Sequence, residues 1–272
     1  MTWSEKFKEW LVEEKEETLT TVDGKPIKVF SFNYDSSDEE TMSDWAKHFR
    51  NHYCSDDKID NLRKGTGLSK KDYLLNLKFP DQTMTPGPSV RSGDFSEILI
   101  ADYLEFILSY WVPRTRYSNK INRNSSPMGS DIIGFKLFDL NETNRDILTV
   151  IEAKASYTNT TENRLQKAID DSRKDDIRIA ESLNAIKQRF IEQNDNDKKQ
   201  RIERFQNPTD KPYTKFYGAA ALFSTETYSE ELIRTSDTSS HVASSSLMLI
   251  VVKGERMMNL VNELYRRAAD EA

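Results

Sequence analysis

Apolar residues near the N-terminus recur at the spacing of amphipathic helices. Trp3, Phe7 and Trp10 fall on one helical face. Such a stripe is more often core packing than a docking surface for a partner. A second helix is predicted after Ser36, where an S-x-x-E sequence has the form of a capping box. This helix should run to about Cys54 and bury one face, made of Met42, Trp45, Ala46, Phe49 and Tyr53.

Two β-rich segments, residues 18–22 and 27–32, precede the predicted second helix. Asp23 and Gly24 lie between them and are typical of a hairpin turn. The clearest break in the chain is DQTMTPGP, residues 81–88. We therefore expect an N-terminal α+β extension over residues 1–85 and a second domain over residues 86–272.

The second domain alternates predicted helices and strands. In chain order, its expected segments are a helix over 93–111, a strand over 112–117, a polar loop over 120–129, strands over 131–138 and 147–155, a charged helix over 162–190, a hydrophilic break over 194–199, buried strands over 216–223 and 247–252, and a helix over 255–268. This order predicts an α/β core with a mixed sheet flanked by helices.

Composition excludes several classes of protein. The 272 residues include 39 Lys and Arg against 45 Asp and Glu, a net charge of −6. No stretch approaches the roughly 20 apolar residues of a membrane span, and the acidic N-terminus does not resemble a targeting signal. A single cysteine, Cys54, excludes a disulfide framework and Cys-based zinc sites. We expect a soluble, cytoplasmic protein with no membrane partner.

One polar residue on the helix over 93–111 stands where the periodicity expects an apolar one. Glu97 aligns with Ala101, Leu104 and Leu108 on the same helical face. Its carboxylate is therefore expected to point toward the core.

Three further polar residues share inward-facing positions on two predicted strands. Asp131 has the parity of Ile133, while Glu152 and Lys154 end the next strand on one face. Each residue alone has an ordinary explanation as a turn, edge or surface residue. Together with Glu97 they form a cluster of three carboxylates and one lysine, whose burial is costly unless the charges pair or bind a cation.

This constellation resembles the PD-(D/E)xK nuclease superfamily over about residues 93–225. The resemblance implies a restriction-endonuclease-like core and metal-dependent cleavage of phosphodiesters. It implies Asp131 and Glu152 as ligands of Mg²⁺ or Mn²⁺, with the carbonyl of Ala153 as a further oxygen. Lys154 would orient or deprotonate the attacking water, and Glu97 would hold a second metal, a water or Lys154.

Two positions depart from the superfamily pattern. The aspartate follows Ser130 where the motif's name has proline. The Gln-x-x-x-Tyr of some branches is absent, because Gln166 is followed at +4 by Asp170. Neither departure removes a metal ligand.

Other candidate contacts are basic residues and histidines. Arg114, Arg116, Lys120 and Arg123 lie in a stretch without acids and are candidates to bind nucleic-acid phosphates, with an ordinary solvated loop as the alternative. His48 and His52 have the spacing of a zinc pair on a helix, but without an accompanying zincin pattern a surface position is the expectation.

The sequences around the four motif residues also resemble HamA, the nuclease-like subunit of the Hachiman anti-phage system, which works with the helicase HamB. This resemblance implies DNA as the substrate and a HamB-like helicase subunit as the partner, with no homo-oligomer required. The net charge of −6 also favours a partner that brings the DNA. A stand-alone restriction-type endonuclease and a non-catalytic regulatory subunit of a helicase remain alternatives.

Overall fold

The structure, a computed structural model, describes residues 2–15, 18–138, 143–158 and 162–272, except for the side chains of residues 175–177. The strands are β1 (Leu11–Glu13), β2 (Leu19–Thr20), β3 (Pro26–Phe32), β4 (Ile132–Lys136), β5 (Ile147–Ser156), β6 (Thr214–Ser224) and β7 (Met248–Gly254). The α-helices are α1 (Trp3–Trp10), α2 (Glu39–Tyr53), α3 (Ile59–Arg63), α4 (Lys70–Tyr73), α5 (Gly87–Asp102), α6 (Arg164–Ser172), α7 (Asp175–Glu192), α8 (Asn196–Glu203), α9 (Glu230–Arg234) and α10 (Met257–Asp270). Two π-helical turns follow α4 and α5, namely η1 (Leu74–Lys78) and η2 (Tyr103–Ile107).

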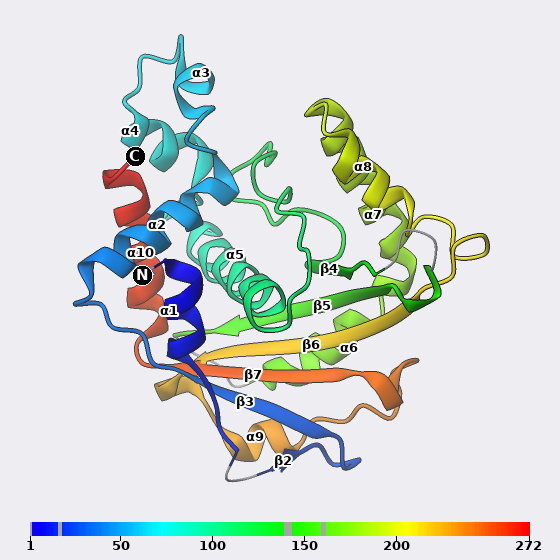
Figure 1. The fold of residues 1–272 in the computed structure, drawn as a ribbon. Helices are drawn as coiled ribbons and strands as arrows, with labels where there is room; N and C mark the ends of the chain where they lie inside the picture. Colours follow the sequence, from blue (N-terminus) through cyan, green and yellow to red (C-terminus); the bar gives the residue numbers. More distant parts are fainter. Residues whose placement is uncertain (1, 16–17, 139–142, 159–161) are drawn as a thin grey trace.

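All seven strands belong to one mixed sheet (Figure 1). The order is β1-β3-β7-β6-β5-β4, and β2 pairs with β3. The central neighbours run parallel, while β1 and β4 pair antiparallel at the two edges. The predicted α/β class with a mixed sheet is therefore confirmed.

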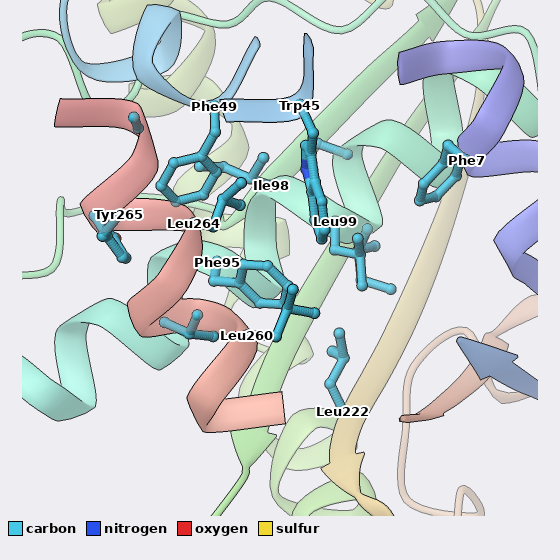
Figure 2. Close-up of a cluster of buried hydrophobic side chains, with 14 of the residues drawn as sticks. Phe7, Trp45, Phe49, Phe95, Ile98, Leu99, Leu222, Leu260, Leu264 and Tyr265 are labelled. Carbon is cyan, nitrogen blue, oxygen red and sulfur yellow. The ribbon is translucent and has the colours of Figure 1, made fainter. Parts of the chain in front are cut away.

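Helices cover both faces of the sheet because its strands alternate apolar side chains between two cores (Figure 1). Ile151 and Leu222 face α1, α2, α5 and α10, whereas Val150 and Ala221 face α6, α7, α8 and α9. Figure 2 shows the first core, where Phe49 and Phe95 are both fully buried. Burial of such a side chain contributes about 1.5–3 kcal/mol to stability.

The N-terminal segment is built into the same sheet as the rest of the chain. β3 pairs in parallel with β7 from Ile27 to Phe32, and α2 packs on α10. Trp3, Phe7 and Trp10 are buried, and Trp3 stacks on Trp45 with ring centroids 4.2 Å apart. The aromatic stripe is thus core packing and is not available for docking. The boundary at residue 85 stays a prediction.

Several predicted elements are wrong in detail. Residues 112–117 are not a strand, and the isolated bridge next to them joins Trp111 and Phe135. Pro113 has no amide hydrogen to donate to a strand ladder. The helix predicted from residue 93 already begins at Gly87. The cap of α2 is Asp38, which accepts from the Thr41 amide over 3.1 Å, in place of the predicted Ser36 box.

Two corrections concern the charged region after β5. The single helix predicted over 162–190 is two helices, α6 and α7, separated at residues 173–174. The hydrophilic break predicted over 194–199 contains the start of α8, which Asp195 caps by accepting from the Lys198 amide. No helix among the residues that the structure describes is long and apolar enough to cross a membrane.

Candidate active site at the edge of the sheet

Asp131 lies directly before β4, and the strand register places it opposite Glu152. Ile132 pairs with Ile151 across β4 and β5, so one further step along both strands aligns the two acids. The Ala153 amide donates to Asp131 Oδ2 over 3.3 Å. Directly opposed residues of an antiparallel pair have Cβ atoms about 4.5–5.5 Å apart, and like charges there repel.

Lys154, near the end of β5, partly compensates the repulsion between Asp131 and Glu152. Its Nζ lies 2.5 Å from Glu152 Oε1 and 3.1 Å from Asp171 Oδ2 on α6. Glu152 Oε2 is buried and has no hydrogen-bond partner among the described residues. The carboxylate therefore keeps one oxygen in the interior for a further donor or cation.

Glu97 approaches the cluster from α5, on the other side of the sheet. Tyr117 donates its hydroxyl to Glu97 Oε2 over 2.5 Å. Arg116 bridges the two sides, with Nε 2.9 Å from Glu97 Oε2 and Nη2 2.8 Å from Asp131 Oδ1. The Nε–H is not aligned with the carboxylate, so this first contact is ionic and not a hydrogen bond.

Burial dominates the protonation of the carboxylates. It raises the pKa of Asp131 to about 7, and the charge of Glu152 adds to the effect, while Arg116 opposes it. Burial also raises the pKa of Glu97, again against Arg116. Burial lowers the pKa of Lys154, but the charge and hydrogen bond of Glu152, together with Asp131 and Asp171, outweigh burial and raise that pKa overall, so Lys154 is a cation at neutral pH.

A cleft of about 470 Å³ opens over this network. Its charged lining side chains are Glu97, Arg116, Asp131, Lys154, Arg164, Arg178 and Glu181. Glu152 is only 4% exposed and lies beneath the cleft. The structure thus brings the four candidate catalytic residues into one network, with three of them at the surface of the cleft.

The four cations proposed as phosphate contacts are all engaged in internal ion pairs. The pairs are Arg114 with Asp102 and Glu105, Arg116 with Glu97 and Asp131, Lys120 with Asp94, and Arg123 with Asp81. The side chain of Lys120 is 3% exposed. The four cations are therefore not the free side chains of a solvated loop, and contact with nucleic acid stays a prediction for these residues.

Sequence reasoning missed Asp94, another buried acid on α5. Asp94 accepts from the Tyr53 hydroxyl over 2.7 Å and pairs with Lys120, while its Oδ1 is buried without a hydrogen-bond partner. Burial raises its pKa. Its position three residues before Glu97, on the same helical face, was the available signal.

His52 is buried, whereas the side chain of His48 is 25% exposed. His52 is 4% exposed, its Nε2 lies 3.2 Å from that of His48, and His48 Nε2 lies 2.9 Å from Asp102 Oδ1. Together the three residues place possible metal ligands within 4.8 Å of one another. Arg114 also approaches Asp102 Oδ1, at 2.6 Å, and already balances its charge. The predicted surface position is wrong for His52, because α2 packs this side chain toward the end of α5, while His48 stays partly exposed.

The residues at the sheet edge fit a hard divalent cation. Asp131 and Glu152 offer opposed carboxylates, and the unpartnered Glu152 Oε2 is the kind of oxygen that Mg²⁺ prefers. Within the described parts of the chain, His48, His52 and Asp102 alone bring three possible ligands within 4.8 Å. A metal at the sheet edge would therefore rest on two carboxylates, with Glu97 farther away.

Fold and site together define an α/β protein with a buried acid and lysine network at the edge of a mixed sheet. The family model described as HamA matches residues 5–268, and the chain belongs to the HamA family. A search of curated proteins found no match. Membership of the HamA family points to a component of Hachiman defence, and the placement in the PD-(D/E)xK superfamily stays a prediction.

Proposed function

We propose that the chain is a metal-dependent DNA nuclease, the effector subunit of a Hachiman anti-phage complex with a HamB-like helicase. The observation that carries the proposal is the opposition of Asp131 and Glu152 beside Lys154. Two like charges held face to face in the interior, one of them with an open oxygen, are costly for a merely structural site. A cation removes that cost.

Asp131 and Glu152 would hold Mg²⁺ or Mn²⁺. Such an ion supplies Lewis acidity toward a phosphate and lowers the pKa of a bound water. Lys154 is held by Glu152 and Asp171, and its raised pKa favours a role as a cation that orients water and offsets charge on the phosphate, rather than a base. Glu97 and Arg116 would position Asp131 from the other side of the cleft.

A helicase partner would compensate for the weak electrostatic attraction between the isolated chain and DNA. The net charge is −6, and the cations of the loop that precedes β4 are paired internally. Long-range attraction of DNA is therefore weak, and a DNA-translocating subunit would deliver the strand to the cleft. The same dependence would protect the host's DNA, since the nuclease would cut only the DNA that the helicase brings to its cleft.

The test is co-expression with a HamB-like helicase, purification through a tag on the helicase, and cleavage of plasmid DNA with Mg²⁺ and ATP. The wild-type complex should cut, and Glu152→Gln should reduce the rate by at least about 100-fold because one metal ligand is lost. Glu181→Gln is the matched control, since Glu181 lines the same cleft without contacting Asp131 or Lys154 among the described residues.

Unchanged cutting by the Glu152→Gln complex would refute the proposal. Robust digestion by the pure chain would instead favour a stand-alone restriction-type enzyme. A non-catalytic regulatory subunit is the second candidate, favoured by Arg116, because its guanidinium already pairs with Glu97 and Asp131. Complex formation without any metal-dependent cutting would support that candidate.

A further inference from the structure

We propose that Arg164, Arg178 and Arg189 form the track that binds the phosphates of a DNA strand across the cleft. This inference rests on the proposed nuclease function and names its substrate contacts. It replaces the loop cations as the main phosphate contacts, because those cations pair with buried acids.

Three cavities adjoin one another along the site. The cleft of about 470 Å³ shares Arg116, Pro127 and Asp131 with a cavity of about 330 Å³ beside α7. It shares Ser89, Ser92 and Arg164 with another of about 520 Å³ beside the start of α5. The candidate metal ligand Asp131 and the lysine therefore lie in the middle of a continuous depression.

The cations of this depression differ in how their charges are paired. Arg116 and Lys120 are tied to buried carboxylates, as described above. Arg178 has no ion-pair or hydrogen-bond partner for its side chain among the described residues, although it lines the cleft with Lys154. Its charge is therefore available to a ligand.

Arg164 and Arg189 form ion pairs only with exposed glutamates. Arg164 Nη1 lies 3.1 Å from a Glu162 carboxylate that is 66% exposed, and its Nε is buried without a hydrogen-bond partner. Arg189 contacts the exposed Glu192 at 3.2 Å. Exposed pairs of this kind contribute little to stability and exchange readily for a phosphate.

Helix α7 gives the track its direction. Arg178 and Arg189 are eleven residues apart, close to three full turns, so they share a face about 16 Å apart. Ser182 lies between them and accepts from the Ser130 amide over 3.1 Å, which seats α7 against the start of β4. The span matches about five nucleotides of a stacked strand. Arg164 would contact the strand on the other side of Lys154.

The experiment is fluorescence anisotropy with a labelled 12-nucleotide single-stranded DNA and the full-length chain in EDTA, where no hydrolysis occurs. Arg164→Gln and Arg178→Gln should each weaken binding about 10- to 150-fold, the effect of one charge-assisted hydrogen bond. Each should also reduce the slope of log affinity against log salt by about 0.7. The control is Arg173→Gln, an exposed arginine on the far end of α6 that contacts Ser240.

Weaker binding in the two variants with unchanged melting temperatures, and wild-type binding in the control, would support the track even if the chain hydrolyses nothing. Equal binding by the wild type and both variants would overturn the track and leave the nuclease proposal standing if DNA is still cut. Absence of DNA binding by the wild type at about 50 mM salt would also overturn it, since phosphate contacts are strongest there.

Discussion

Arg116 places its guanidinium 2.8 Å from Asp131, on the carboxylate that the site would offer to a metal. The same guanidinium lies 2.9 Å from Glu97, so one side chain neutralises the acids from both sides of the sheet. A metal ion and Arg116 therefore compete for Asp131. Without a metal, the arginine keeps two buried acids from being left unpaired.

Arg116→Met should destabilise the metal-free protein and strengthen metal binding. Removing one partner of a buried pair costs about 3–5 kcal/mol, and the freed Asp131 oxygen becomes available to Mn²⁺. We expect a lower midpoint in urea without metal and a larger rise of that midpoint when Mn²⁺ is added. Isothermal titration calorimetry with Mn²⁺ measures the affinity directly.

Arg123→Met is the matched control for this change. Arg123 comes from the same loop and pairs with Asp81, away from the cluster. It should lose stability without any gain in Mn²⁺ affinity. Weaker Mn²⁺ binding in Arg116→Met than in the control would contradict the competition.

The site was partly predictable because strand parity is a strong constraint. Asp131, Glu152 and Lys154 share a face through alternation alone, and the antiparallel register then brings Asp131 and Glu152 together. The role of Arg116 was not predictable, since its partners lie on helix α5 and just before β4, beyond the reach of local sequence patterns. A basic stretch without acids nearby in the sequence is interpreted as a solvated loop, even when its side chains form ion pairs with buried acids from other elements.

The fold shows the same division between local and distant information. The buried face of α2 follows from its periodicity, and Met42, Trp45 and Phe49 are buried as predicted. The pairing of β3 with β7 joins the two ends of the chain, and no local pattern specifies it. The proposed boundary at residue 85 was based on the turn-forming residues 81–88, and such residues do not indicate which distant strands pair.

Glu152→Gln and Lys154→Met should change the stability of the metal-free protein in opposite directions. The first removes a charge opposite Asp131 and leaves Lys154 paired with Asp171, so stability should stay equal or rise by up to about 1 kcal/mol. The second leaves Glu152 buried without its cation and should cost about 1–3 kcal/mol. Urea unfolding in EDTA measures both, and a loss of several kcal/mol in Glu152→Gln would show that this acid supports the fold.

Metal binding should depend on pH through Asp131. Its folded pKa of about 7 lies above the usual 3.8, so the folded state holds a proton that the unfolded state has released. The metal-free protein should therefore lose stability as pH rises from about 4 to about 7. A metal competes with this proton, and its apparent affinity should rise about tenfold between pH 6 and pH 8. Calorimetry with Mn²⁺ at both pH values provides the measurement, and a pH-independent affinity would exclude Asp131 as a ligand that must lose its proton.

Asp102 should act as a structural ion-pair centre rather than as a metal ligand. It accepts from the Trp3 indole over 3.2 Å and contacts His48 and Arg114, which together outweigh burial and lower its pKa. Asp102→Asn should therefore cost about 3–5 kcal/mol at pH 7, because Arg114 is left with less compensation. The lowered pKa means that this stabilisation is present above about pH 4 and is lost as the pH falls below it, so the difference between variant and wild type should shrink in acid.

Zn²⁺ should leave the melting temperature of the wild type unchanged, since Arg114 already balances the carboxylate of Asp102. A Zn²⁺-dependent rise in melting temperature that disappears in His52→Gln would instead identify a metal centre at this position.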